Sequence, residues 1–145
     1  MTAERVAAYH RLHGDDYASR RSRERKYEAI LSLANFAGRH VLDVGAGTGE
    51  FRKMLPRCNY TGIDLLDGEN VLDHHTRYDI VVANGIFYKL DHNGEVVRLI
   101  RHMWTLTRET LIFTSLSKWA PRKDASELHL DPSESISLAQ GQARI

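Results

Sequence analysis

The residues whose spacing points most clearly to chemistry are three glycines at alternate positions: Gly45, Gly47 and Gly49. They follow a short apolar run at 41–44, which predicts a buried strand and is interrupted by one carboxylate, Asp43. Glycines after a strand let the backbone turn sharply and let a ligand approach the main chain closely. Residues 49–56 are compatible with a helix, so the loop is predicted to end at a helix N-terminus. A strand, a glycine loop and a helix N-terminus together predict a nucleotide site.

The glycine spacing and the position of Asp43 separate two classes of nucleotide ligand. The dinucleotide fingerprint is GxGxxG, with a third glycine that permits tight packing around a pyrophosphate, and here the third glycine comes one position earlier. A carboxylate two positions before the first glycine would sit poorly beside a pyrophosphate and well beside a cationic ammonium group. The sequence therefore disfavours a NAD-dependent oxidoreductase.

Residues 41–49, VLDVGAGTG, resemble the first motif of the class I S-adenosylmethionine (SAM)-dependent methyltransferases, which typically reads (V/I)LD(V/L)GxGxG. The resemblance implies an α/β fold, a Rossmann-like three-layer sandwich around a mostly parallel sheet. It implies SAM as the cofactor and S-adenosylhomocysteine (SAH) as the product. It places Asp43 near the ammonium group of SAM and the loop against the methionine part. The loop residues assigned to the cofactor are Val44, Gly45, Ala46, Gly47 and Gly49.

A second acidic residue lies where a ribose ligand is expected. Residues 60–65 read as a strand, and Asp64 closes that strand 19 positions after Gly45. A ribose-binding acid lies about twenty residues after the glycine loop in nucleotide-binding folds, because adjacent parallel strands end at the same edge of the sheet. We predict that Asp64 accepts from the ribose hydroxyls; the alternative is a solvated turn aspartate. The resemblance implies that Leu65 borders the adenine.

The next segment departs from the family pattern. Only residues 66–77 precede an apolar run at 78–83, and a parallel crossover needs about a dozen residues, usually including a helix. The sequence therefore predicts a reduced sheet with a vestigial or missing third strand. Within the segment, NVLD at 70–73 resembles a short acidic motif that contacts the adenine amino group in relatives. Asp73 is thus a candidate adenine contact, and a plain turn residue is the equal alternative.

Asn84 and Gly85 follow the run at 78–83, a predicted buried parallel strand, at the end where ligands bind in open α/β sheets. The resemblance makes them the fourth motif, whose main chain lies under the transferable methyl. Methyltransferases that act on nucleic-acid amino groups typically carry (D/N/S)PP(Y/F) here, and this chain has neither proline. A base amine is therefore disfavoured as acceptor, and NGIF resembles endings found in small-molecule methyltransferases.

The chain is predicted to form one domain, with residues 1–37 as a helical lid and residues 38–145 as the core. The other predicted elements are helices at 2–13, 19–36, 93–107 (with Asn93 as N-cap) and from Pro132 onward (with Asp131 as N-cap), and a strand at 110–116. In the family an antiparallel hairpin completes the sheet, and that hairpin is missing here. The last strand is then an unpaired edge, which predicts a truncated product or a homodimer that covers the edge.

Two histidines and a lysine of the predicted lid are further candidates. His10 and His13 could act as a general base for an oxygen acceptor, because histidine titrates near neutral pH; the alternative is that they pack or cap the lid. Lys26, or Arg23 beside it, could pair with the carboxylate of the cofactor. The basic run around them otherwise reads as a solvated helix face.

Composition limits the function classes. The 145 residues have a formal net charge of +1, which argues against a dedicated polyanion binder, so nucleic acid is an unlikely partner. The single cysteine fits a reducing compartment, and no apolar run approaches a membrane span, so a cytoplasmic protein is expected. None of the eight histidines lies in a metal-ligating constellation, so no metal site is predicted.

Three interpretations follow. The leading one is a SAM-dependent methyltransferase that transfers the methyl group by in-line displacement to a small molecule. The second is a SAM-binding protein without transfer activity, which the short 66–77 segment and the missing hairpin favour. The third is RNA methylation guided by the basic run at 20–26, which predicts salt-dependent RNA affinity.

Overall fold

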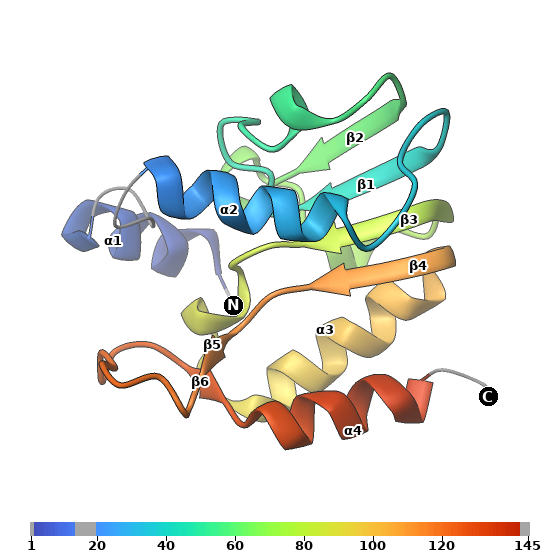
Figure 1. The fold of residues 1–145 in the computed structure, drawn as a ribbon. Helices are drawn as coiled ribbons and strands as arrows, with labels where there is room; N and C mark the ends of the chain where they lie inside the picture. Colours follow the sequence, from blue (N-terminus) through green and yellow to red (C-terminus); the bar gives the residue numbers. More distant parts are fainter. Residues whose placement is uncertain (1, 14–19, 143–145) are drawn as a thin grey trace.

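The structure is a computed structural model that describes residues 2–13 and 20–142. Four strands form one sheet in the order β2-β1-β3-β4, and every neighbouring pair is parallel (Figure 1). The strands are β1 (His40–Val44), β2 (Asn59–Ile63), β3 (Tyr78–Ala83) and β4 (Thr107–Phe113), with β5 (Leu116–Ser117) and β6 (His129–Leu130) in a second, parallel pair. The helices are α1 (Ala3–His13), α2 (Arg20–Leu31), α3 (Asn93–Thr105) and α4 (Pro132–Gln142), and the 3-10 turns are η1 (Arg52–Met54), η2 (Leu65–Asp67), η3 (Val71–Asp73) and η4 (Phe87–Lys89).

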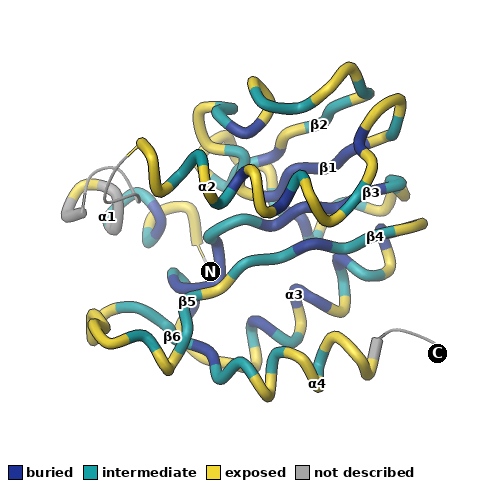
Figure 2. The backbone as a smooth tube through the Cα atoms, in the orientation of Figure 1, coloured by how far each residue is buried: buried dark blue, intermediate teal, exposed yellow. Residues whose placement is uncertain are grey.

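The sheet is covered on both faces, which confirms the predicted three-layer α/β sandwich. α2 lies over one face, and α3 lies over the other with α4 beside it (Figure 1). Successive side chains of a strand point to opposite faces. Val41 therefore packs in the cluster that contains Ile30 of α2, whereas Leu42 packs in the cluster that contains Ile100 of α3. The central strands β1 and β3 are buried on both sides (Figure 2), which is why their sequences are almost continuously apolar.

The predicted reduction of the sheet is confirmed. Residues 64–77, all of which the structure describes, form the turns η2 and η3 and no strand. Each turn is capped by its preceding side chain, because Asp64 accepts from Leu66 N at 2.9 Å and Asn70 accepts from Leu72 N at 3.0 Å. β2 is therefore one edge of the sheet and β4 is the other. A homodimer that covers the β4 edge stays a prediction.

The prediction of a helix at 49–56 is wrong. The segment forms turns and η1, a single 3-10 turn of three residues. A first helical turn is costly to form, and the few residues before Pro56 leave no length over which propagation could offset that cost. Phe51 is buried against Tyr27, with ring centroids 5.2 Å apart, so the segment packs under α2. The glycine loop consequently does not lead into a helix N-terminus, and the dipole that favours a phosphate ligand is missing from residues 45–56.

Two helix boundaries also differ from the prediction. α2 ends at Leu31 and not at residue 36, because the chain turns to bury Phe36, and Asn35 Oδ1 accepts from Ala37 N at 3.2 Å in that turn. Asn93 is the first residue of α3 and not its N-cap; the cap is His92, whose side chain makes no capping hydrogen bond.

At the C-terminal end, one strand moves and one helix is confirmed. β4 spans residues 107–113 and not 110–116, because Thr107 pairs with Tyr78 directly after α3 ends. α4 begins as predicted at Pro132, with Asp131 Oδ1 accepting from Ser133 N at 2.9 Å. Among the described residues, no helix combines the length and the apolar character needed to cross a membrane.

Candidate functional site

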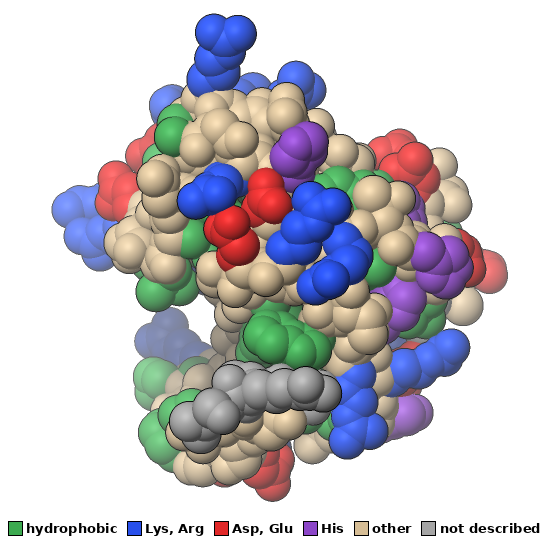
Figure 3. Space-filling view, turned by 90° about the vertical axis from the view of Figure 1, so that its right-hand side faces the viewer, with side chains coloured by type: hydrophobic (Ala, Val, Ile, Leu, Met, Phe, Trp, Pro, Cys, Tyr) green, Lys and Arg blue, Asp and Glu red, His purple; other side chains and the backbone are tan. Residues whose placement is uncertain are grey.

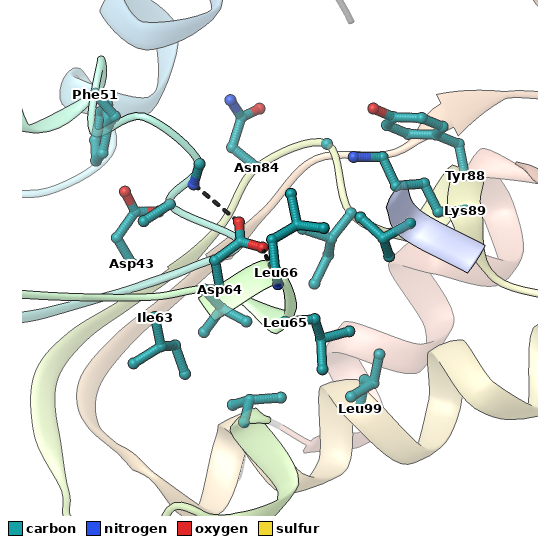
Figure 4. A pocket seen from close by; sticks show the side chains of 18 of the residues that line it. Asp43, Phe51, Ile63, Asp64, Leu65, Leu66, Asn84, Tyr88, Lys89 and Leu99 are labelled. Atoms are coloured by element: carbon teal, nitrogen blue, oxygen red, sulfur yellow. Dashed lines mark hydrogen bonds between the residues drawn. The ribbon is translucent and has the colours of Figure 1, made fainter. Parts of the chain in front are cut away.

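A cavity of about 520 Å³ lies at the carboxyl ends of β1, β2 and β3 (Figure 4). Parallel α/β sheets place ligands at this edge, because the loops that leave the strands converge there. The predicted cofactor residues that line the cavity are Asp43, Val44, Gly45, Ala46, Gly47, Asp64, Leu65, Asn84, Gly85 and Lys26. Gly49 does not line it, and neither does Asp73, which is exposed at the end of η3. The neighbours of Asp73 that do line the cavity are Asn70, Val71 and Leu72.

The glycine loop is held between β2 and β3. Gly45 N and Ala46 N both donate to Ile63 O, at 2.8 and 3.1 Å, which ties the loop to the end of β2. Gly45 has φ +77°, and a Cβ there would lie 2.4 Å from Ile86 Cγ2. Any side chain at this position would therefore be strained and would clash with the segment after β3. The loop backbone therefore reaches the cavity wall in a conformation that only glycine can adopt at position 45.

Asp43 is a buried carboxylate at the base of the loop, with 3 % of its surface exposed. The Tyr60 hydroxyl donates to Asp43 Oδ2 at 2.7 Å. Burial raises the pKa of Asp43 to about 6, the Tyr60 hydrogen bond acts in the opposite direction, and the charge of Asp64 adds to the increase. Asp43 is thus charged at neutral pH in an environment that favours a cationic partner.

Asp64 joins two backbone segments with its two carboxylate oxygens. Oδ2 accepts from Gly47 N in the glycine loop at 2.9 Å, and Oδ1 accepts from Leu66 N in η2 at 2.9 Å (Figure 4). Each carboxylate oxygen has a further lone pair. The side chain therefore holds the loop in place and retains acceptor capacity for a hydroxyl group.

The side chain at the end of β3 is a neutral amide, Asn84. The Thr114 hydroxyl donates to Asn84 Oδ1 at 2.7 Å and accepts from Gly85 N at 2.9 Å. Thr114 follows β4, so this one side chain connects the ends of two neighbouring strands. The main chain at Asn84 and Gly85 is thereby held at the cavity wall.

The remaining walls mix apolar and charged side chains. In Figure 4, Leu66 lies beside Asp64 and Leu65 and Leu99 lie below it, while Tyr88 and Lys89 lie across from Asp64. The Lys89 ammonium group is 5.2 Å from the centroid of the Tyr88 ring. Leu99 of α3 is buried in the cluster that packs against the sheet, and it also lines the cavity.

The N-terminal segment contributes to the same site. α1 contacts η2 and η4, its Val6 is buried and lines the cavity, and Arg5 pairs with Asp91. Arg23 and Lys26 of α2 line the cavity as well. His10 and His13 fall within α1, and their side chains lie outside what the structure describes, so their role as a general base stays a prediction.

The lining residues Leu66, Tyr88 and Lys89 were not predicted from the sequence, and neither were two residues that support the site from behind its wall. Tyr60 and Thr114 act through hydrogen bonds to Asp43, Asn84 and Gly85. Tyr60 carries a weak signal, since it lies in the predicted strand two positions before Gly62, and period two places both on one face of that strand. Thr114 carries none, because its partners are distant in sequence.

The opposite edge of the sheet has a different character. Figure 3 shows this face, on which basic, acidic and histidine side chains are interleaved. Arg39 pairs with Glu109 at 2.9 Å and Arg108 with Asp79 at 3.5 Å. The Arg39–Glu109 pair is exposed on both sides, and such pairs contribute little to stability. Within the described residues, no group of three or more His, Cys, Asp or Glu side chains could hold a metal ion.

The order of the strands, the glycine loop after β1 and the cavity at the carboxyl edge define a class of fold. The chain has the Rossmann-like fold of the class I SAM-dependent methyltransferases, in a reduced form. No protein-family model matches the chain, and no curated protein matches it either. The likeness to solved structures shows the fold alone, because the sequence identities are low.

Three solved structures illustrate the likeness. The chain is similar to magnesium protoporphyrin IX methyltransferase from Synechocystis PCC 6803 with bound SAH, at 13% identity and TM-score 0.63, covering 96% of this chain and 85% of that one. It is similar to the N-methyltransferase NodS from Bradyrhizobium japonicum WM9 in complex with SAH, at 18% identity and TM-score 0.64, covering 88% and 76%. It is also similar to small RNA methyltransferase HEN1, at 10% identity and TM-score 0.64, covering 88% of this chain and 22% of that one.

Proposed function

We propose that this chain is a SAM-dependent methyltransferase that acts on a small molecule. The observation that carries the proposal is the buried Asp43 carboxylate beside the glycine loop, at the cavity edge of a methyltransferase fold. A buried negative charge is costly unless a partner offsets it, and the ammonium group of SAM is such a partner. The solved relatives with bound SAM or SAH support the same cofactor.

The donor set fits the cofactor. Asp43 would hold the ammonium group, the backbone of residues 45–47 would pack against the methionine part, and Asp64 would accept from the ribose hydroxyls. Leu65 and the neighbouring η3 residues would border the adenine. Lys26 or Arg23 would pair with the carboxylate of the cofactor. The lack of a helix N-terminus at the loop, together with two carboxylates there, argues against a pyrophosphate ligand.

When bound, SAM supplies a methyl group that its sulfonium already activates, so the protein's main task is alignment. The backbone at Asn84 and Gly85, held by Thr114, would form the surface under the methyl. In-line attack needs the acceptor about 3 Å from the methyl on the side opposite sulfur, and such orientation supplies most of the rate. The apolar walls around Leu99 and Tyr88 would exclude water from that space.

We further propose that residues 1–37 form a lid over residues 38–145. Contacts of α1 with η2 and η4, and the position of Val6 at the cavity, support it. His10 or His13 would take the proton from an oxygen acceptor. The Asn84–Gly85 turn lacks both prolines that are typical of methyltransferases acting on nucleic-acid amino groups, which favours a small molecule as acceptor over a nucleic-acid base. A cytoplasmic location fits the single cysteine.

Two measurements test the proposal. Titration calorimetry with SAM and with SAH should detect binding of both to the purified chain. Incubation with methyl-labelled SAM and separate low-molecular-mass and RNA fractions of a cell extract should then label the low-molecular-mass fraction. Binding without any transfer would identify a SAM-binding protein, label in RNA would overturn the small-molecule acceptor, and no binding by an intact fold would overturn the proposal.

A further inference from the structure

We propose that Tyr60 is a positioning residue for the cofactor site, because it holds the Asp43 carboxylate in the orientation that receives the ammonium group of SAM; this rests on the proposed function. Its hydroxyl donates to Asp43 Oδ2 at 2.7 Å, a short bond between two side chains 17 residues apart in sequence. Asp43 lines the cavity, while Tyr60 does not, so Tyr60 acts through Asp43 and not on a ligand.

The backbone of β2 is arranged for this contact. In the parallel register, Val41 pairs with Tyr60 and Asp43 pairs with Gly62. Because Tyr60 and Gly62 are two residues apart, they share a face of β2, and the Tyr60 ring extends over Gly62 toward Asp43. A Cβ on Gly62 would lie 2.8 Å from the Tyr60 hydroxyl oxygen and 2.9 Å from Ala46 Cβ. The missing side chain at Gly62 therefore gives the hydroxyl its space between the two strands.

A cation fixes the ring from the outside. The Arg52 guanidinium carbon is 5.3 Å from the centroid of the Tyr60 ring, a cation–π distance. Tyr60 is half-buried, and burial together with the charge of Asp43 raises its pKa well above the usual range. Its hydroxyl consequently stays protonated and remains a donor to Asp43 at every pH at which the protein would work.

The hydrogen bond affects the charge of Asp43 as well as its position. Burial and the nearby Asp64 raise the pKa of Asp43 to about 6, and the Tyr60 bond acts against them. The other charged groups at this part of the site are Arg52 behind Tyr60 and the cavity-lining Arg23, Lys26 and Glu50. Removal of the Tyr60 hydroxyl should raise the pKa of Asp43 further, toward neutral pH. The protein would then lose the negative charge that the ammonium group needs.

The substitution Tyr60→Phe tests the proposal, because it removes the hydroxyl and keeps the ring over Gly62 and under Arg52. SAM affinity measured against pH should fall on the acid side as Asp43 takes up a proton and on the alkaline side as the amino group of SAM loses one, at about pH 8. In Tyr60→Phe the acid limb of this pH profile, where affinity falls as Asp43 is protonated, should move to higher pH. The alkaline limb should stay in place. At pH 7 the affinity should fall about tenfold, typical for the loss of a hydrogen bond to a charged group.

The matched control is Tyr78→Phe, which removes the hydroxyl of a half-buried tyrosine on β3 that does not line the cavity. It should leave both limbs unchanged. An NMR titration of the Asp43 side-chain carboxyl in the ligand-free protein adds a measurement that needs no cofactor, and its midpoint should rise in Tyr60→Phe. Equal carboxyl midpoints, or an unmoved acid limb, would overturn the role of Tyr60. A wild-type protein that does not bind SAM would instead overturn the proposed function, while the carboxyl titration would still measure the Tyr60–Asp43 coupling.

Discussion

The strand ends at the edge of the cavity form two halves that differ in charge: the ends of β1 and β2 are the anionic half, and the end of β3 is the neutral half. The ends of β1 and β2 carry two carboxylates, Asp43 and Asp64, each held by hydrogen bonds from the protein. The end of β3 carries an amide, Asn84, bound to the hydroxyl of Thr114 beyond β4. The strand ends of the first half are therefore anionic and that of the second is neutral, at positions that the topology makes equivalent, while charged side chains from other segments, such as Lys26 and Lys89, line the walls around both.

The difference matches what a sulfonium cofactor requires. The ammonium group and the ribose hydroxyls do not change during a methyl transfer, so anionic acceptors can hold them in every state of the reaction. The sulfonium loses its positive charge as the methyl leaves, so a carboxylate beside it would stabilise the ground state more than the transition state. A neutral surface at Asn84 and Gly85 avoids that penalty. Charge in one half and neutrality in the other are then both part of the proposed mechanism.

Gly45 joins the two halves, so its substitution should have the largest effect. Gly45→Ala would place a methyl group where a Cβ lies 2.4 Å from Ile86 Cγ2, at φ +77°. The loop must move away from Ile86, which separates the anionic half from the neutral one. We expect SAM affinity to fall at least about 100-fold in calorimetry and the free energy of unfolding to fall by about 1–3 kcal/mol.

Gly68→Ala is the matched control for that prediction. Gly68 has a similar φ of +81°, and a Cβ there would meet no atom within 4 Å. The backbone strain is therefore comparable, and the clash is absent. Gly68→Ala should lower stability and leave SAM affinity within about threefold. Similar affinities for the two variants would contradict the role of Gly45 as the joint between the halves.

The buried charge of Asp43 in the anionic half should make the free energy of unfolding depend on pH. The pKa of Asp43 is raised to about 6 in the folded protein, above its ordinary value, because of burial. The folded state thus holds this proton more tightly than the unfolded chain, so the contribution of Asp43 to stability is highest below about pH 4 and declines as the pH rises to about 6. Asp43→Asn removes this titration. The unfolding free energy of Asp43→Asn minus that of wild type should therefore increase by about 2–3 kcal/mol between pH 4 and pH 7, measured by urea unfolding. A constant difference across that range would show that Asp43 is not a costly buried charge.

The sequence predicts the anionic half well because its residues lie in one local pattern. Asp43 and the glycines occupy a contiguous string, and Asp64 follows at a spacing that parallel strands impose. The β1 and β3 strands are predictable because burial on both faces makes them apolar throughout. The reduced sheet is predictable because residues 66–77 are too few for a crossover with a helix and a strand.

The errors have physical reasons that a local pattern does not contain. The residues at 49–56 have helical propensity, but the burial of Phe51 against α2 determines their conformation. The shift of β4 follows from its register with β3, which starts at the Tyr78–Thr107 pair. Tyr60 and Thr114 depend on contacts between strands, so their partners become visible only when the sheet is assembled.

A smaller effect is expected where the anionic half binds its own backbone. Asp64→Asn replaces one carboxylate oxygen by an amide nitrogen, which cannot accept from Gly47 N or Leu66 N. One of the two bonds is lost along with the charge, and SAM affinity should fall about tenfold. Asp73→Asn is the control, because Asp73 is exposed and does not line the cavity. A loss of affinity in Asp73→Asn as large as in Asp64→Asn would instead support the adenine contact predicted for Asp73.

Substitution in the neutral half should have the smallest effect. It tests whether the hydrogen bonds of Thr114 align the backbone at Asn84 and Gly85 for methyl transfer. Thr114→Val keeps the shape of the side chain and removes the hydroxyl that bonds Asn84 Oδ1 and Gly85 N. The control is Thr110→Val on β4, whose side chain does not line the cavity. We expect Thr114→Val to lower the free energy of unfolding by about 1 kcal/mol and SAM affinity by about threefold, and Thr110→Val to change neither. Because the hydroxyl acts on the surface proposed to lie under the methyl, Thr114→Val should slow methyl transfer by a larger factor than it weakens SAM binding. If the rate of methyl transfer and the SAM affinity fall by the same factor, Thr114 supports only the fold and does not align the methyl group.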